Sequence, residues 1–390
     1  HNYMDFDNLK DYVKISYELT QDGLVIGKGK LAEVSVVPHS EGKTNLQVNV
    51  PENGKCYLKL IYHLKKEMPL LEEDYILGFD EIEVSQKDAK CQLAEKWVEK
   101  TVTDSELQVS EDDTQIHIKG REFAYTIDRR TALFTEMKFA GREYLNHPME
   151  LNIWRAPTDN DMYIKSEWKK AHYDKAYTRA YTTEVVQGKH GVKITSHASV
   201  VAETVQKILD VTITWKIEAA GKIDADIAVT KDDEFPDLPR FGVRMFLDKK
   251  LSAARYFGMG PQESYCDKHQ AASHGLYQAN VDDLHEDYIR PQENGSHYDC
   301  EYVELNNSRY GIVASAEKAF SFNASYYTQE ELEKKTHNYE LTESDSVVFC
   351  VDYALNGIGS NSCGPVVLEQ YRFDDVLFRF QFTLIPYIKG

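Results

Sequence analysis

The stretch 211–229, VTITWKIEAAGKIDADIAV, carries the pattern that decides the fold of this chain. Apolar residues occupy every second position on both sides of Gly221: Val211, Ile213, Trp215 and Ile217 before it, and Ile223, Ala225, Ile227 and Val229 after it. An alternation with a period of two places the apolar side chains on one face of a strand, and a glycine between two such runs favours a hairpin turn. The stretch therefore predicts two antiparallel strands that share one buried face.

The same alternation recurs along most of the 390 residues, whereas helical composition is confined to SEWKKAHYDKAYTR (166–179) and TQEELEKKTH (328–337). The first group of predicted strands is YVKISYEL (12–19), KLAEVSVV (30–37), TNLQVNV (44–50) and CYLKLIYHL (56–64), with Asp22-Gly23 as a hairpin turn after the first of them. The second group includes TQIHIKGREFAYTID (114–128), FGVRMFL (241–247), GIVASAE (311–317), FSFNASYY (320–327), SVVFCVDYAL (346–355) and VLFRFQFTLI (376–385). We expect an all-β protein with an immunoglobulin-like β-sandwich at 1–86, a connector at 87–113 with one strand, KWVEKTV (96–102), and a large β-sandwich at 114–390.

The net charge and the composition restrict the kinds of partner that this chain can bind. The formal net charge is −19, which argues against nucleic acid or an anionic membrane because the phosphate attraction would become repulsion. The sequence has no apolar run of membrane-spanning length and no signal-peptide pattern in its first residues, so we expect a cytoplasmic protein. The six cysteines are widely scattered and predict neither a disulfide framework nor a zinc site.

Four corners between strands are rich in polar residues, glycine and proline. They are WRAPTDND (154–161), FGMGPQESYCD (257–267), IRPQENGSHYDC (289–300) and NGIGSNSCGP (356–365). Asparagine, aspartate and glycine are ordinary turn residues, so the corners are explained by turn chemistry alone. They are also explained as loops at one end of a sandwich, where amides and carboxylates suit sugar hydroxyls. Both interpretations stay open at this level.

Asp159, Asn160 and Asp161 raise two chemical possibilities. They resemble the start of an EF-hand loop, but the glycine and the distant glutamate of that loop are missing, so no metal site is predicted. Glycosidase chemistry needs two carboxylates that face each other across the scissile bond. Nothing in the sequence identifies a group that would raise the pKa of either aspartate, and no nucleophile or phosphate-binding motif occurs.

The four corners, with LPRFGVRM (238–245) between them, resemble the C-terminal part of bacterial β-galactosidases of glycoside hydrolase family 2, in order and in spacing. The resemblance covers essentially the whole chain, since FDNLKDYVKISYELTQDG (6–23) through EDYILGFDEIEV (73–84) is similar to the immunoglobulin-like domain that precedes the last domain in those enzymes. It implies an immunoglobulin-like sandwich followed by a large antiparallel super-sandwich of galactose-mutarotase-like type. It also implies a role as the non-catalytic part of a retaining β-galactosidase that hydrolyses terminal β-galactosides such as lactose.

In that family the catalytic glutamates, and the ligands of magnesium and of sodium or potassium, lie mainly in a TIM barrel upstream of this region. A TIM barrel needs about 250 residues of alternating strands and helices, which this chain does not have. The resemblance therefore implies that the chain has no catalytic residue and no metal ligand of its own. The implied partners are a catalytic barrel, in the same polypeptide or in a large subunit, a galactoside at a shared rim, and further copies in an oligomer. The absence of an initiator Met at position 1 favours a piece of a longer chain over a natural small subunit.

The resemblance also assigns roles to individual residues. The rim candidates for carbohydrate contact are Asp159, Asn160 and Asp161, which precede a loop at Met162–Tyr173, together with Asn361 and Cys363. Cys363 lies at or next to the position where the family can carry a stacking tryptophan, and a thiol cannot supply that flat surface. The polar residues expected to tie the loops together are Arg155, Glu263, Asp267, Arg290 and Glu293. Lys268 stands where an arginine is frequent, which keeps the charge and loses the bidentate geometry.

Two other functions compete with this one. An aldose epimerase on the same fold would need a histidine and a glutamate as acid and base, and His172, His274 and His297 are available but lie in no epimerase-like motif. A carbohydrate-binding or purely structural module would need no acid–base pair at all.

Overall fold

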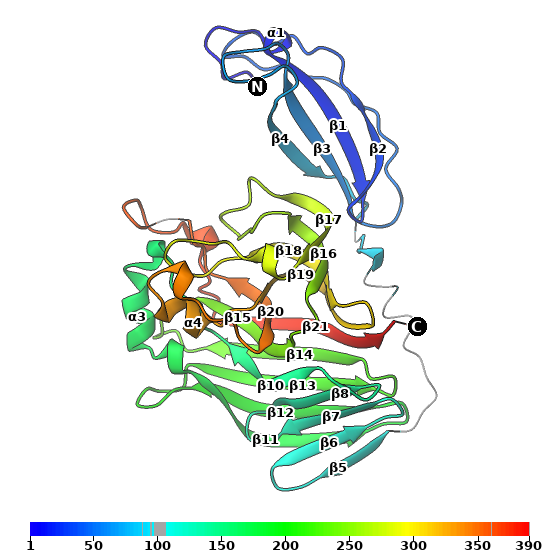
Figure 1. The fold of residues 1–390 in the computed structure, drawn as a ribbon, viewed down its shortest axis with the longest axis vertical. Coiled ribbons are helices and arrows are strands. Elements are labelled where there is room, and N and C mark those ends of the chain that lie inside the picture. Colours follow the sequence, from blue (N-terminus) through cyan, green and yellow to red (C-terminus); the bar gives the residue numbers. More distant parts are fainter. Residues whose placement is uncertain (88, 94–95, 97–106, 360, 390) are drawn as a thin grey trace. The chain divides into compact units, whose positions relative to one another are not determined.

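The computed structural model describes residues 1–87, 89–93, 96, 107–359 and 361–389, and it divides into two compact units (Figure 1). Unit 1 comprises the described residues of His1–Leu93 together with His274–Leu276, and unit 2 the described residues of Ala94–Ser273 and Tyr277–Gly390. The strand predicted at KWVEKTV (96–102) lies outside the described residues except for its first position. No helix among the described residues has the length and apolarity to cross a membrane.

Unit 1 contains one antiparallel sheet in the order β2-β1-β3-β4. Its elements are α1 (Leu9–Tyr12), β1 (Val13–Gln21), β2 (Leu24–Lys30), β3 (Cys56–Leu64) and β4 (Ile76–Glu83). The hairpin predicted at Asp22-Gly23 is confirmed, because Gln21 pairs with Leu24 and both turn residues have positive φ angles, 48° and 79°. Two left-handed residues in a two-residue loop match the twist of the flanking strands.

Two strands predicted for this unit are wrong. The segments KLAEVSVV (30–37) and TNLQVNV (44–50) form no strand beyond Lys30, and the described residues between β2 and β3 contribute only an isolated bridge from Ser40 to Asn2. The backbone around Val36 is instead hydrogen-bonded to the N-terminal segment: its N–H donates to the Asn8 side chain (3.0 Å), and its carbonyl accepts from the Leu9 N–H (2.9 Å). Pro38, which cannot donate to a ladder, follows directly. The second sheet of an immunoglobulin-like sandwich is therefore not formed by these segments, and that fold stays a prediction.

Unit 2 consists of two antiparallel sheets (Figure 1). The smaller sheet runs in chain order through β5 (Gln108–Glu111), β6 (Gln115–Lys119), β7 (Phe123–Asp128), β8 (Leu133–Phe139) and β9 (Arg142–Glu143). The twelve strands of the larger sheet are β10 (Leu145–Asn152), β11 (Tyr177–Gln187), β12 (Gly191–Val201), β13 (Leu209–Glu218), β14 (Ile223–Lys231), β15 (Arg240–Asp248), β16 (Ala253–Gly260), β17 (Ser273–Asn280), β18 (Ser296–Asn306), β19 (Tyr310–Ser325), β20 (Ser346–Leu355) and β21 (Leu377–Ile388). The all-β fold class and the large antiparallel super-sandwich predicted from the sequence are confirmed.

The hairpin of β13 and β14 shows how the two sheets pack. Trp215 pairs with Ala225 in the ladder and is fully buried. Its indole contacts Phe134 of the smaller sheet edge to face, with ring centroids 4.9 Å apart, and its N–H donates to the Ala132 carbonyl at 2.8 Å. The turn residue Gly221 accepts a hydrogen bond from the Tyr125 hydroxyl at 2.7 Å. The apolar face predicted from the alternation is thus the interface between the sheets.

β19 changes partner along its length, and this opens the larger sheet locally. Residues 310–315 of β19 pair with 383–388 of β21, whereas residues 321–325 pair with 348–352 of β20. The end of β20 and the start of β21 therefore lie on the same side of one strand without a ladder between them among the described pairings.

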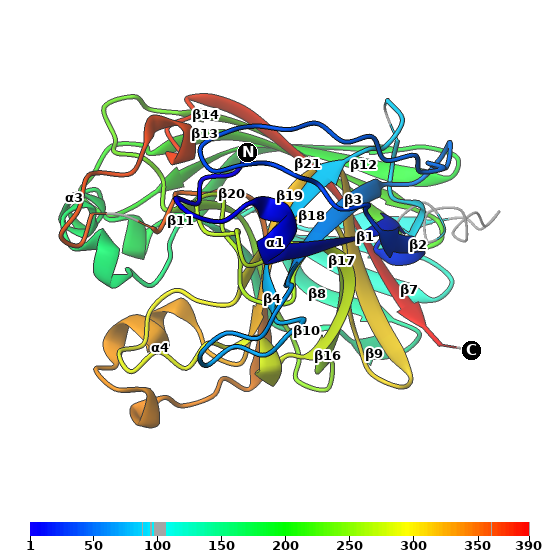
Figure 2. The same cartoon turned by 90° about the horizontal axis from the view of Figure 1, so that it is seen from above.

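The remaining elements are short helical turns. They are α3 (Ile164–Lys170), α4 (Gln329–Lys334) and the 3-10 turns η1 (Asp159–Asp161), η2 (Tyr173–Lys175), η3 (Asp282–Leu284), η4 (Asn338–Glu340) and η5 (Glu369–Tyr371). Both helices lie at the same side of unit 2 in the two views, and Lys169 of α3 lies 2.5 Å from the Glu333 carboxylate of α4 (Figures 1 and 2). The helical composition of 166–179 extends beyond the helix, because His172 adopts a left-handed conformation (φ 57°) and β11 begins at Tyr177.

Replacement of Trp215 by alanine tests the packing of the two sheets. Loss of a fully buried indole and of its hydrogen bond is expected to lower the free energy of unfolding of unit 2 by about 3–5 kcal/mol. Denaturant unfolding followed by far-UV circular dichroism measures the change. The control is Tyr181→Ala at an exposed position of β11, which should shift stability by less than about 0.5 kcal/mol. Equal effects of the two variants would contradict this account of the core.

Candidate functional site

The four polar corners meet in unit 2, and they are called the corner cluster below (154–161, 257–267, 289–300 and 356–365). The Glu293 N–H donates to the Ala156 carbonyl at 3.0 Å, which joins the first corner to the third. The Asn160 side-chain amide donates to the Ile358 carbonyl at 2.6 Å, which joins the first corner to the fourth. The Ile358 N–H donates to the Asp267 carboxylate at 3.0 Å, which joins the fourth to the second. Segments more than 200 residues apart in the sequence therefore form one loop assembly.

Arg155 lies at the centre of this assembly and is completely buried. Its guanidinium forms a two-point ion pair with Asp161, with N–O distances of 3.1 and 2.7 Å. It also donates to the carbonyls of Asn356 (2.5 Å) and Gly357 (3.1 Å). Trp168 of α3 lies under the same guanidinium, 5.2 Å from its central carbon to the ring centroid. Four hydrogen bonds of a buried cation fix the first corner against the fourth.

A second buried arginine, Arg240, joins the strands to the third corner. It forms a two-point ion pair with Asp352 of β20 (3.2 and 2.6 Å) and donates to both oxygens of Glu293 (3.2 and 3.3 Å). Burial raises the pKa of both carboxyl groups, and the Arg240 charge opposes that rise. Arg240 and Asp352 are not among the site residues predicted from the sequence. A signal was present, because a carboxylate inside the apolar run VVFCVDY is expected only where a cation pairs with it.

The second corner is held by carboxylates that accept from several donors. The Glu263 carboxylate, nearly buried, accepts from the Gly295 N–H at 2.8 Å and from Lys268 and the Tyr288 hydroxyl. Lys268 thus contacts a single carboxylate oxygen, as its ammonium geometry allows. Asp267 accepts from the N–H groups of Ile358 and Gly359, the latter at 2.8 Å.

The position of Arg290 differs from the one predicted from the sequence. It was expected among the residues that tie loops together through buried bonds, but 64% of its side chain is exposed, and its guanidinium lies 4.0 Å from the exposed carboxylate of Asp159. The neighbouring Pro291 is buried in its place, and the Arg290 carbonyl accepts from the Gln292 amide at 3.1 Å. A solvent-exposed pair at this distance contributes little to stability.

The rim candidates separate into two groups. A cavity of about 520 Å³ is lined by Asn160, Asp161 and Asn361, with Tyr163, Asp237, Arg372 and six further residues completing its wall. Asp159 and Cys363 are exposed and do not line it. Asn361 has a φ of +89°, a backbone conformation that asparagine tolerates better than most residues. Amide, carboxylate and guanidinium groups around a cavity of this size suit a polar ligand rich in hydroxyl groups.

The two aspartates of the first corner are not an acid–base pair. Because η1 is a 3-10 turn, Asp161 points inward to Arg155 and caps the turn by accepting from the Thr158 N–H (2.9 Å), whereas Asp159 points to solvent. Among the residues that the structure describes, no group of three or more histidine, cysteine, aspartate or glutamate side chains is arranged to hold a metal ion. Three carboxylate residues, Asp161, Glu167 and Asp237, line the cavity, and Asp161 is held by the Arg155 guanidinium.

The histidines named for an epimerase are dispersed. His297 is buried at the start of β18, packs against Tyr256 and Phe322, and has its pKa lowered to about 4 by burial. Its Nδ1 lies 3.3 Å from the Met259 carbonyl, which fixes the proton on that nitrogen. His172 lies between α3 and η2, and His274 lies on β17.

The described part of unit 2 is thus an all-β, two-sheet domain in which buried ion pairs join four loops. Comparison with known proteins identifies the family. The model of the "Beta galactosidase small chain" matches residues 119–384, and that of "Beta-galactosidase, domain 4" matches residues 1–85. The chain belongs to the β-galactosidase small-chain family.

The relatives extend this result. The chain is 42% identical over 387 residues to a β-galactosidase of Actinobacillus pleuropneumoniae, which covers 99% of the chain and 37% of the relative. It is 30% identical over 389 residues to a β-galactosidase of Staphylococcus xylosus, covering 98% of the chain and 38% of the relative. The chain therefore spans little more than a third of the length of these relatives. Among solved structures, a galactose 1-epimerase from Lactobacillus acidophilus aligns with 74% of the chain and 100% of its own, at 9% identity and a TM-score of 0.38.

The buried pair of Arg155 and Asp161 is tested by Asp161→Asn. This change leaves a buried guanidinium without its carboxylate, so the free energy of unfolding of unit 2 should fall by about 3–5 kcal/mol. Denaturant unfolding measures the loss. The matched control is Asp159→Asn, two residues away and exposed, which should cost less than about 0.5 kcal/mol. If Asp161→Asn proves as mild as the control, Arg155 does not hold the corners through this pair.

The buried His297 predicts a pH dependence of stability. Between pH 6.5 and about 4 the unfolded state binds a proton at this residue and the folded state does not, so the contribution to stability is present above that window and is lost as the pH falls through it. The expected loss is on the order of 3 kcal/mol. Denaturant unfolding of the wild type and of His297→Phe, which keeps the ring packing and cannot titrate, isolates this contribution. A parallel decline of both proteins over this pH range would refute it.

Proposed function

We propose that this chain is the C-terminal, non-catalytic part of a retaining β-galactosidase that hydrolyses terminal β-galactosides such as lactose. The observation that carries the proposal is the corner cluster itself. Its buried arginines, Arg155 and Arg240, are paired with carboxylates and, for Arg155, with backbone carbonyls, so these charges hold loops in place. Membership of the family and the length of the relatives agree with a catalytic region outside this chain.

The surface around the corner cluster supports a partner at this place. Large apolar side chains are exposed on or beside three of the four corners: Met162 and Tyr163 after the first, Ile289 at the start of the third, and Val366 and Leu368 after the fourth. Exposed apolar groups that gather at one place mark a surface that another protein region covers. The proposed occupant is the catalytic barrel, since about two thirds of the length of the relatives lies outside the matched part.

The rim cavity is the proposed meeting point with the galactoside. Asn160 and Asn361 supply amides, and Asp161 and Arg372 supply charged groups at its wall. Asp159, which is exposed and lies outside the cavity wall, is proposed to contact the sugar or the barrel, and Cys363 lies on the same loop as Asn361 without a flat stacking surface. The magnesium and sodium or potassium of the family are proposed to bind in the catalytic region, because the family resemblance implies that their ligands lie mainly there. The assembly is proposed to be a cytoplasmic oligomer.

Complementation tests the proposal. The purified chain is mixed with a barrel-containing region, taken from the part of the Actinobacillus pleuropneumoniae relative that precedes the matched segment, and hydrolysis of o-nitrophenyl β-galactoside is followed. The chain alone should be inactive, and the mixture should be active. Hydrolysis by the chain alone, or rapid interconversion of α- and β-galactose by it, would contradict the assignment.

The docking surface has its own variants in the same assay. Ile289→Asp and Tyr163→Asp place charges on exposed apolar positions, so each should reduce the restored activity at least about tenfold by weakening association, which corresponds to about 1.4 kcal/mol. Tyr181→Asp, exposed on β11 and outside the corner cluster, is the control and should leave the restored activity unchanged. Full restoration with both docking variants would place the interface elsewhere.

A further inference from the structure

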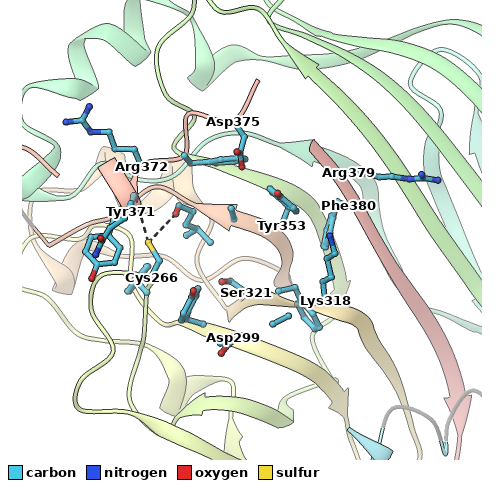
Figure 3. A pocket seen from close by; sticks show the side chains of 18 of the residues that line it. Cys266, Asp299, Lys318, Ser321, Tyr353, Tyr371, Arg372, Asp375, Arg379 and Phe380 are labelled. Carbon is cyan, nitrogen blue, oxygen red and sulfur yellow. Dashed lines mark hydrogen bonds between the residues drawn. The ribbon is translucent and has the colours of Figure 1, made fainter. Parts of the chain in front are cut away.

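Unit 2 contains a second cavity, and most of the residues that line it lie outside the corner cluster. It measures about 420 Å³ and is called the interstrand slot here; Figure 3 shows it from close by, with Tyr353 and Phe380 on one part of the wall and Ser321, Lys318 and Asp299 on another. Its volume falls within the range of about 300–1,000 Å³ that is usual for small-molecule sites. Only Arg372 lines both this slot and the rim cavity.

The slot follows from the path of β19. This strand pairs with β21 through residues 310–315 and with β20 through residues 321–325, so residues 316–320 lie where the pairing changes. Residues 353–355 of β20 and 379–381 of β21 form the two sides of the opening that results, and the loop 370–375 covers one end. The opening results from the strand pairing of the larger sheet. It therefore does not depend only on the position of the loop 370–375.

The wall between the two strands is aromatic. Tyr353, which is half-buried, stacks on Phe378 with ring centroids 4.9 Å apart and an interplanar angle of 16°, and it contacts Phe380 at 6.1 Å edge to face. This packing holds the tyrosine ring in a fixed orientation. A preformed aromatic surface in a pocket binds the apolar face of a ring at little cost in side-chain entropy.

Polar groups of different kinds surround that surface. Burial and the neighbouring Asp375 carboxylate raise the pKa of the Tyr353 hydroxyl, and Figure 3 shows Ser321, Asp299 and Lys318 on the opposite part of the wall. Through these residues, the wall of the slot contains two hydroxyl groups, two carboxylates and an ammonium group. Such a mixture of donors and acceptors matches a ligand with several hydroxyl groups.

The charges favour a neutral ligand. The Arg379 guanidinium is held by the Asp226 carboxylate with an Nε–Oδ1 distance of 2.6 Å, and it points away from the slot in Figure 3. Arg372 likewise points outward, and its Nε donates to the Val367 carbonyl at 2.9 Å. With these two cations turned away and a net charge of −19 on the chain, an anionic ligand is disfavoured.

The geometry points to the interstrand slot as a binding site for a neutral saccharide of one or two rings. One sugar ring stacks on Tyr353, and its hydroxyl groups bond to Ser321, Lys318 and Asp375. The site lies within unit 2 and goes beyond the proposed function, because it requires neither the catalytic region nor the rim cavity. It would hold a carbohydrate that is not being cleaved.

Ligand-observed NMR on the 390-residue chain tests this site, with galactose, lactose, maltose and galacturonate as the probes. Saturable binding of at least one neutral sugar is expected, with a dissociation constant on the order of millimolar for a small neutral ligand. Galacturonate should bind more weakly than galactose. Failure of all three neutral sugars to show saturable binding, or tighter binding of galacturonate, would overturn the proposal.

Variants locate the binding. Tyr353→Leu keeps an apolar contact with Phe378 and removes the flat ring, so it should weaken binding at least about tenfold. The matched control is the same substitution at Tyr339, which is 80% exposed on η4 and should change nothing. Lys318→Met, at an exposed position that folding does not require, should weaken binding several-fold, and thermal unfolding checks that Tyr353→Leu remains folded. Binding that both slot variants leave intact, or that Asn160→Ala in the rim cavity abolishes, would overturn the assignment while leaving the complementation test unaffected.

Discussion

Two buried guanidinium groups, those of Arg155 and Arg240, carry the interactions on which the loop end of unit 2 depends. Arg155 binds Asp161 and two carbonyls of the fourth corner, and Arg240 binds Asp352 and Glu293. A buried charge is tolerable only when its hydrogen-bonding capacity is satisfied, and removal of one partner is far more costly than the net contribution of the intact pair. The arrangement therefore favours one loop conformation strongly over the others.

This constraint explains how the β scaffold fixes the conformation of the loops at its end. The sheets bury aromatic and aliphatic side chains between them, with Trp215 in the middle, and they hold β15 and β20 in register beneath the corners. Arg155 and Arg240 then join the loops to one another and to these strands, so that the loops do not move independently. The result is a rim cavity with amide groups in its wall and exposed apolar side chains beside it.

The sequence predicted the strands of unit 2 well, because their alternation reflects one buried face, and Val211–Val229 is the clearest case. The segments 30–37 and 44–50 alternate in the same manner but form no ladder beyond Lys30, since a period of two reports which side chains are buried and not whether a partner strand exists. For the site, the motifs located the corners correctly as a group. They did not predict that Asp161 would turn inward and Asp159 outward, because that depends on a 3-10 turn.

Other parts of the site required long-range information. Arg240 and Asp352 are brought together by the pairing of β15 with β20, and they are 112 residues apart. Arg290 is a residue type that often joins loops through hydrogen bonds. Only the structure shows that Pro291 is buried at this point of the loop and that the Arg290 side chain faces solvent. The interstrand slot was invisible to sequence analysis, because it arises from the exchange of partners along β19 and from no motif.

The most direct test of the central claim is amide hydrogen exchange in the Arg155→Met variant. The N–H groups of Glu293, Ile358 and Gly359, which bond within the corner cluster, should exchange at least about tenfold faster than in the wild type, because the corners can then open without unfolding of the sheets. The amides in the middle of β13 and β14 should keep their wild-type rates. Unchanged exchange at the three corner amides, or uniform acceleration across unit 2, would contradict the claim that a buried arginine holds the corners together.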